Sequence, residues 1–274
     1  MKKIFLILFT LISLNSFSQA DLNKIAKGIT EEGKKLYQLE MAAWYGSDIF
    51  RENFNGPEQI GGYFSYMDSK TPKCLFFSRE ETPNVIGVIS FNDIQIAETA
   101  NIDFKKREFK SFEKDIYSIR QRALAEIQQD TILFKTYTNT SLNLIPIISG
   151  GEKKVYVLTG PRNPGVILFG NDYLLTFNKQ NNLIKKEKLH QNLIPVEFNL
   201  DSDKTVIGAF HSHSSESSEF ITPTDICTLM LYAKFAGWKS HHVISKDYVS
   251  IWNCENETLE IMNREDFDKM NENK

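Results

Sequence analysis

Hydrophobic positions recur along this chain with two different spacings. Between residues 21 and 55 they return every three or four positions, which predicts an amphipathic helix, although Gly28 and Gly33 leave two shorter helices as an alternative. Residues 60–98 instead hold β-rich runs separated by turn-forming segments, which predict three strands. These runs cover 63–66, 74–77 and 85–89. The first part of the chain, 21–105, is therefore expected to form a helix followed by a three-stranded meander.

The pattern from residue 106 onward indicates a second region. Residues 106–129 have helical spacing, and 222–236 form a second helix closed by Gly237. A short terminal helix is expected over 263–270. Strands are expected at 142–148, 154–158, 166–169, 173–177, 183–198 (interrupted), 206–213, 242–244 and 248–252, with Asn181 and Asn182 in a hairpin turn. The prediction is an α+β protein whose region 106–274 holds a mixed sheet with flanking helices.

The first twenty residues have the layout of a secretory signal peptide. Lys2 and Lys3 precede an apolar run over 4–14, and Ser16, Ser18 and Ala20 are small residues suited to cleavage. The run is short for a membrane span, and an uncleaved N-terminal anchor is the alternative. We therefore expect 1–20 to be removed and the protein to be exported, to the periplasm or beyond the cell. No later segment is apolar enough to cross a bilayer, so no stable membrane span is expected after cleavage.

Composition places the chain among ordinary globular proteins. Its 274 residues include 32 Lys and Arg against 35 Asp and Glu, a formal net charge of −3. Without a basic cluster, no nucleic-acid partner is expected. Three cysteines, Cys74, Cys227 and Cys254, are too few for a disulfide-built fold and contain no Cys-x-x-Cys pair. Whether two of them pair is left open.

One group of residues points to metal chemistry. His211 and His213 lie two apart in an expected strand, so their side chains share a face, and their Cα atoms are about 6.6 Å apart. Asp225 follows at the start of the next expected helix. Two imidazoles and a carboxylate suit Zn²⁺ and leave a fourth position for water, as catalytic zinc requires. The sequence therefore predicts a zinc site.

The same residues also have a purely structural interpretation. Thr222 is a good helix N-cap, Pro223 suits the first helical position, and Asp225 can bond back to the cap. This interpretation leaves the histidine pair unexplained, unless both simply face solvent. The two interpretations are partly compatible, because one carboxylate oxygen can serve the cap while the other binds a metal.

His211-Ser212-His213 followed by Thr222-x-x-Asp225 resembles the signature of the JAMM (JAB/MPN-type) zinc metalloproteases. The resemblance covers at most residues 106–274. It implies a JAB/MPN-like fold in which the two histidines and Asp225 bind zinc, and a hydroxyl at Thr222 assists the tetrahedral intermediate. It also implies a glutamate from an earlier strand as general base. The implied reaction is hydrolysis of a peptide or isopeptide amide in a protein or peptide substrate not identified by the sequence.

The chain departs from this signature at several points. Ser214 stands where the family has proline, Thr222 replaces serine, and the loop to Thr222 is one residue longer. Glu152, before an expected strand, is the candidate base, although an ordinary exposed glutamate would look the same. Asp172 and Glu197 are weaker candidates. A metal-binding relative without activity is therefore the second hypothesis, with 21–105 as the binding or assembly surface. A toxin- or immunity-type exported factor is a third.

The remaining histidines and the tryptophans are expected to be structural. His241 and His242 are adjacent in an expected strand, so they face opposite sides and at most one can join the site. His190 lies in a polar stretch and is expected to be exposed. Packing in apolar cores is expected for the three tryptophans: Trp44, Trp238 and Trp252.

Overall fold

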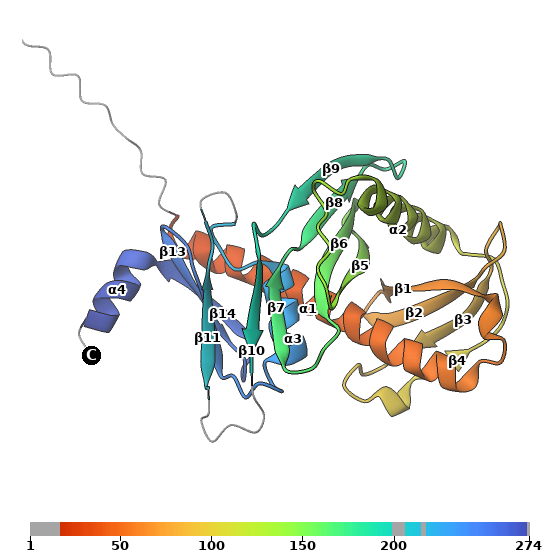
Figure 1. The fold of residues 1–274 in the computed structure, drawn as a ribbon, viewed down its shortest axis with the longest axis horizontal. Helices are drawn as coiled ribbons and strands as arrows, with labels where there is room; N and C mark the ends of the chain where they lie inside the picture. The colour runs from red at the N-terminus through yellow and green to blue at the C-terminus, as the bar shows by residue number, and fades with distance from the viewer. Residues whose placement is uncertain (1–16, 199–205, 215–217, 273–274) are drawn as a thin grey trace, which may run out of the picture.

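The computed structural model describes residues 17–198, 206–214 and 218–272, and it confirms the α+β class. Within these residues, four helices combine with four sheets, most of whose strand pairs are antiparallel (Figure 1). The helices are α1 (Gln19–Asn53), α2 (Ser111–Gln129), α3 (Pro223–Tyr232) and α4 (Arg264–Glu272). Two short 3-10 turns span Pro57–Gln59 and Ala97–Thr99. A helix and a meander come first in the described part of the chain, as predicted for residues 21–105.

The first sheet is a meander of four strands rather than three. It has the order β1-β2-β3-β4, with all pairs antiparallel. The predicted strands correspond to β1 (Ile60–Asp68), β2 (Thr71–Ser78) and β3 (Val85–Ser90), and β4 (Asn101–Asp103) is a short addition at the edge.

The middle of the chain forms a second sheet and a separate strand pair. The sheet has the order β5-β6-β8-β9, built from β5 (Thr140–Ser149), β6 (Glu152–Pro161), β8 (Tyr173–Phe177) and β9 (Leu183–Lys188). Asn181 has φ +64°, as expected for the hairpin between β8 and β9. The pair joins β7 (Val166–Gly170) to β10 (Leu193–Glu197) in antiparallel register. The predicted segment 183–198 is indeed broken, and residues 189–192 connect its two strands.

The last sheet carries the histidine segment. It has the order β11-β12-β13-β14, from β11 (Gly208–Ser212), β12 (Ser240–Ile244), β13 (Tyr248–Asn253) and β14 (Thr258–Asn263). β11 and β12 are parallel, and α3 makes the crossover between them. β14 was not predicted. α3 is shorter than expected, because the helix ends at Tyr232 and turns lead to Gly237, whose φ is +70°.

Helix α1 is continuous through Gly28 and Gly33, so the alternative of two helices was wrong. It runs from the β11–β14 sheet to the β1–β4 sheet and packs against α3, β2 and β14 (Figure 1). Gly33 permits close contact with α3, because a Cβ there would meet the Ile226 side chain at 2.7 Å. α1 begins at Gln19 with Ser18 as its cap, so the last residues of the predicted signal peptide belong to the helix. Residues 1–16 lie outside the described part.

One apolar cluster crosses the predicted boundary between 105 and 106. It joins Leu39 and Phe50 of α1 to Phe76, Ile145 and other residues of both regions. The two-region division therefore stays a prediction. Within the described residues, the longest helices are too polar to span a membrane.

Two of the three tryptophans and two of the three cysteines are buried. Trp238 and Trp252 are buried as expected, but Trp44 is 50% exposed because it lies on the outer side of α1, so that expectation was wrong. All three cysteines are free thiols; Cys74 and Cys227 are buried and Cys254 is partly buried.

Candidate metal centre

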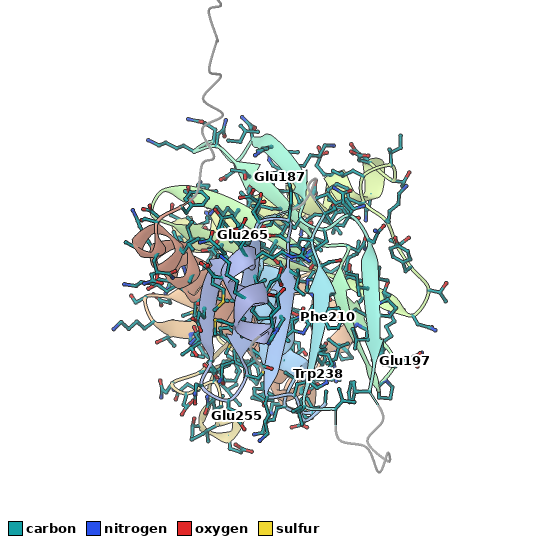
Figure 2. All side chains as sticks on the ribbon, turned by 90° about the vertical axis from the view of Figure 1, so that its left-hand side faces the viewer. Glu187, Glu197, Phe210, Trp238, Glu255 and Glu265 are labelled. Atoms are coloured by element: carbon teal, nitrogen blue, oxygen red, sulfur yellow. The ribbon has the colours of Figure 1, made fainter. Side chains whose placement is uncertain are left out.

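Strand β11 presents the two predicted histidines to the interior. The alternation of the strand turns His211 and His213 to one side, and both are buried. Phe210, the residue directly before His211, faces outward and is 71% exposed (Figure 2). His213 lies just beyond β11, where its backbone N–H donates to the carbonyl of Ile244 at 2.9 Å and continues the pairing with β12. The expected shared face is therefore confirmed.

Asp225 sits at the N-terminus of α3, where it completes a capping box with Thr222. The backbone N–H and the hydroxyl of Thr222 each donate to Asp225 Oδ2 at 2.8 Å, and the Thr222 hydroxyl accepts from the Asp225 backbone N–H at 3.1 Å. Asp225 Oδ1 is buried and has no hydrogen-bond partner. The capping and metal interpretations are thus compatible in this geometry, because Oδ2 serves the cap while Oδ1 faces the imidazoles of His190 and His211.

His190 is buried beside Asp225, contrary to the expectation from the sequence. It was expected to be exposed, but it is 2% exposed and its Nε2 lies 3.1 Å from Asp225 Oδ1. It comes from the connection between β9 and β10, which Gly170 allows to approach closely. A Cβ on Gly170 would lie 3.2 Å from the His190 Cβ and would overlap the carbonyl of Asn192, and Gly170 has φ +82°.

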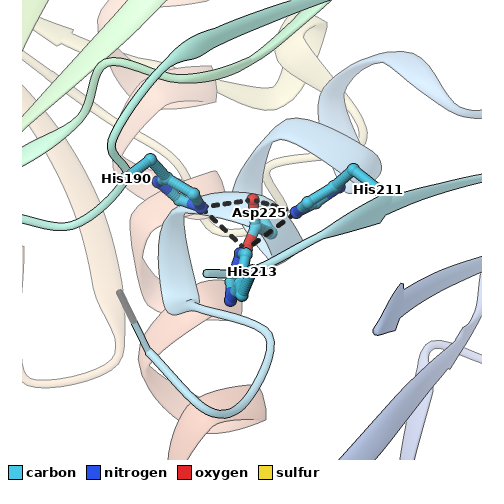
Figure 3. A group of neighbouring side chains, drawn as sticks. All are labelled: His190, His211, His213 and Asp225. Carbon is cyan, nitrogen blue, oxygen red and sulfur yellow. Dashed lines mark hydrogen bonds and ion pairs between the residues drawn. The ribbon is translucent and has the colours of Figure 1, made fainter. Parts of the chain in front are cut away.

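His190, His211, His213 and Asp225 converge in one buried group (Figure 3). Their ligand atoms lie within 4.8 Å of one another. His211 Nε2 is 3.1 Å from His213 Nε2 and 3.7 Å from Asp225 Oδ1, and His213 Nε2 is 3.8 Å from Asp225 Oδ2. Tetrahedral zinc with bonds of about 2.0–2.1 Å would separate its ligand atoms by about 3.3 Å. The group therefore fits a four-coordinate metal ion.

Hydrogen bonds at the far ring nitrogens orient the imidazoles. His213 Nδ1 lies 2.9 Å from the carbonyl oxygen of Ser218, which can only accept, so Nδ1 carries the proton and Nε2 presents a lone pair. His211 Nδ1 lies 2.9 Å from His241 Nε2. With its proton on Nδ1, His211 also presents a lone pair from Nε2. Backing contacts of this kind fix the tautomer of metal-binding histidines.

The electrostatics of the group keep two imidazoles neutral. Burial lowers the pKa of His211 to about 4, with a further lowering from His213, and burial likewise lowers the pKa of His213. Burial alone would raise the pKa of Asp225, but His190 and His211 hold it well below its usual value. Neutral imidazoles and an ionised carboxylate are the protonation states that metal binding requires.

His190 contacts a second carboxylate through its other ring nitrogen. Asp172 Oδ2 lies 3.7 Å from His190 Nδ1. Burial opposes a charge on His190, but Asp225 and Asp172 together raise its pKa to about 9. Burial raises the pKa of Asp172 to about 7, although the backbone N–H of Thr159 donates to its Oδ1 at 2.9 Å. Asp172, considered from sequence as a substitute base, therefore lies beside the group.

The structure does not bring the other candidate bases into the group. The side chain of Glu152 is 67% exposed and pairs with Lys154 at 2.7 Å. Glu152 is the first residue of β6. Thr159, which contacts Asp172, lies seven positions further along the same strand, a distance of about 23 Å. Glu197 is exposed at the end of β10 (Figure 2). The predicted catalytic role of Glu152 is therefore not supported by its position.

Thr222 holds the Asp225 carboxylate in place through its hydroxyl. Its hydroxyl is buried and shared between Asp225 and the Thr224 hydroxyl, which lies 2.9 Å away. A hydroxyl engaged in this way positions a ligand. The predicted contact of Thr222 with a reaction intermediate stays a prediction.

His241 and His242 face opposite sides, as expected. His241 is fully buried, contacts His211 and stacks on the ring of Phe169 at a centroid distance of 4.7 Å. Burial lowers the pKa of His241 to about 3. His242 is partly buried and meets Phe267 of α4 edge-on.

Sequence reasoning missed His190 and undervalued Asp172. The only signal for His190 was the small number of histidines, five in the chain, four of which meet in or beside the group. Its own surroundings are polar and carry no periodicity that would indicate burial.

No family model, curated protein or solved structure matches the chain. The fold and the site define an α+β protein with a buried group of three histidines and one aspartate that can hold a metal ion. The geometry of this group is therefore the feature that indicates a function.

Proposed function

We propose that this chain is an exported zinc-binding protein with a JAMM-like (JAB/MPN-type) C-terminal region. His190, His211, His213 and Asp225 hold one Zn²⁺, which displaces the proton that the two carboxylates keep on His190 when no ion is bound. The observation that carries the proposal is the buried group of four ligand atoms, in which Asp225 Oδ1 has no other hydrogen-bond partner. Three imidazoles and one carboxylate are ligands that suit zinc. The JAMM-like assignment is supported by the His-x-His at the end of β11, the Thr-x-x-Asp at the start of α3 and the parallel return through β12.

Whether His190 binds the zinc ion determines whether the site is structural or catalytic. With His190 as the fourth ligand the coordination is closed, which is typical of structural zinc, whereas catalytic zinc keeps one position open. The closed site ties together three separate segments: the β9–β10 connection, the end of β11 and the start of α3. We therefore favour a binding or assembly module in which zinc stabilises the scaffold.

A second candidate function is hydrolysis of a peptide or isopeptide amide in a protein or peptide substrate. The Asp172–His190 pair favours it, since a histidine backed by a carboxylate is suited to proton transfer. In this case His211, His213 and Asp225 bind the ion, which supplies Lewis acidity when present. His190 Nε2 would then accept a proton from the attacking water and deliver it to the leaving amine, while Asp172 would hold the ring.

Metal content tests zinc binding itself. The protein is purified without chelator, zinc is added back, and zinc per chain is measured by elemental analysis. We expect close to one zinc in the wild type and in His242→Ala, which removes a histidine on the opposite face of β12. The His211→Ala/His213→Ala variant should retain none while keeping its circular dichroism spectrum. A wild type without zinc, or a double variant that retains it, would refute the proposal.

Cobalt substitution separates the two candidate functions. Tetrahedral Co²⁺ has a characteristic visible spectrum that changes when a small anion enters an open position. With the closed site, azide leaves the wild-type spectrum unchanged and alters that of His190→Ala. An azide response in the wild type would instead favour hydrolysis, and peptide cleavage that is lost in His190→Ala would support it directly.

A further inference from the structure

His241 lies directly behind the metal group without belonging to it. It is in β12, where it pairs with Ala209 of the parallel strand β11, so its side chain lies on the same face as that of His211. It is fully buried, and its Nε2 lies 2.9 Å from His211 Nδ1. His241 is outside the four candidate ligands, since His211 contacts it through Nδ1 and contacts the group through Nε2.

Among the described residues, the ring of His241 makes a single hydrogen bond, the one to His211. The rest of its surroundings are aromatic. The ring stacks on Phe169, with centroids 4.7 Å apart and planes at 20°, and on Trp238 at 5.8 Å and 18°. Its Nδ1 is buried and has no hydrogen-bond partner in the described part of the chain. A buried polar atom without a partner costs stability, and an apolar ring would fill the same space without that cost. The hydrogen bond to His211 is therefore what a histidine provides at this position.

A single proton lies between His211 and His241. Burial lowers the pKa of both rings, so each is neutral and carries one N–H. At a distance of 2.9 Å, one of the two facing nitrogens donates and the other accepts. If His211 Nδ1 donates, a lone pair remains on His211 Nε2. If His241 Nε2 donates instead, His211 carries its own proton on Nε2. Only the first arrangement allows His211 Nε2 to bind a metal ion.

Without an ion, the hydrogen bonds favour the second arrangement. His213 keeps its proton on Nδ1, which faces the carbonyl oxygen of Ser218, so His213 Nε2 can only accept. His211 Nε2 lies 3.1 Å from this nitrogen and therefore donates to it. His211 Nδ1 is then an acceptor, and the proton between the two rings belongs to His241 Nε2. Binding of a metal ion to His211 therefore requires the shared proton to move.

We propose that His241 is a positioning residue for the zinc ion, an inference that rests on the proposed function. Its Nε2 accepts the Nδ1 proton of His211 when zinc binds, and donates its own proton to His211 Nδ1 when no ion is bound. On zinc binding, the proton of His211 Nε2 leaves to solvent, the shared proton moves from His241 Nε2 to His211 Nδ1, and His241 Nδ1 takes up one proton from solvent. The rings of His211, His213 and His241 together carry the same number of protons before and after.

Nitrogen NMR of the histidine rings tests the proton shift directly. The full chain is prepared with isotope-labelled histidine, and long-range proton–nitrogen spectra are recorded with and without zinc. Protonated and unprotonated ring nitrogens have well-separated shifts, and the His241→Gln variant identifies the signals of His241. We expect His241 to carry its proton on Nε2 without zinc and on Nδ1 with zinc, while His242 keeps one pattern. The same His241 pattern in both states would overturn the proposal.

Two substitutions of His241 separate its hydrogen bond from its packing. His241→Phe keeps a ring against Phe169 and removes the acceptor, whereas His241→Gln keeps an acceptor in its side-chain carbonyl. Zinc affinity is measured by competition with a chromogenic chelator. We expect His241→Phe to bind zinc about 10–100-fold more weakly than the wild type, and His241→Gln to recover most of that loss. His242→Phe makes the same substitution on the opposite face of β12 and should bind zinc as the wild type does.

The outcomes distinguish this inference from the proposed function. If the wild type and a folded His241→Phe variant bind zinc equally well, the positioning role is refuted and zinc binding stands. Equal losses in His241→Phe and His241→Gln would assign His241 to packing alone and would also refute the role. If His241→Phe does not fold, the NMR spectra of the wild type decide. A wild type that binds no zinc would refute both proposals.

Discussion

Zinc is expected to stabilise this protein against unfolding. Without an ion, the lone pair of His213 Nε2 lies 3.1 Å from His211 Nε2, and Asp225 Oδ1 is buried without a hydrogen bond. An ion that binds the folded chain alone adds about 2.7 kcal/mol when its free concentration is about 100 times the dissociation constant. For a chain of this size each kcal/mol raises the melting temperature by about 2–4 °C. The expected increase is therefore about 5–11 °C.

The assay is thermal unfolding followed by circular dichroism, with buffered zinc titrated into protein stripped by chelator. The melting temperature should rise with the logarithm of free zinc once the site is half filled. His242→Ala should show the same rise, because His242 faces α4 instead of the group. The His211→Ala/His213→Ala variant should show none. An equal rise in that variant would mean that zinc binds elsewhere, and no rise in the wild type would mean that the group holds no zinc.

Three further outcomes are expected. Asp172→Asn should weaken zinc binding about 10–100-fold in a competition assay with a chromogenic chelator, because it loosens His190; unchanged affinity would remove Asp172 from the site. Thr222→Val should lower the free energy of unfolding by about 1 kcal/mol in urea and weaken zinc binding, since it removes the cap that holds Asp225; equal loss in the zinc-free and zinc-loaded protein would show a cap role alone. Glu113→Gln should lower stability by about 3 kcal/mol at neutral pH, because Glu113 is buried between Arg107 at 2.7 Å and Tyr66 at 2.9 Å. Burial opposes ionisation of Glu113, but Arg107 holds its pKa below the usual 4.5. Its contribution is thus complete above pH 4.5 and is lost as the pH falls through the lower folded-state pKa, so the variant and the wild type should converge in acid. A difference that persists at low pH would contradict this assignment.

Local signals in the sequence determined several parts of the site. Alternation along a strand placed His211 and His213 on one face, and the Thr-Pro-Thr-Asp segment indicated both the start of α3 and a free oxygen on Asp225. The hairpin at Asn181 was equally local. Each of these features depends on residues within about four positions of one another. Their local geometry can therefore be predicted from neighbouring residues in the sequence.

Tertiary structure decided the features that depend on distant segments. His190 is 35 positions from Asp225, and it reaches the group because β10 pairs with β7 and Gly170 lets the connection approach. The burial of Asp172 and the exposure of Trp44 likewise depend on which elements pack against β8 and α1. Strand pairing and helix packing between remote segments leave no periodic pattern in the sequence of either segment. The sequence by itself therefore indicated a metal site with three ligands and an open position, and only the folded chain brought His190 beside them as a fourth candidate ligand.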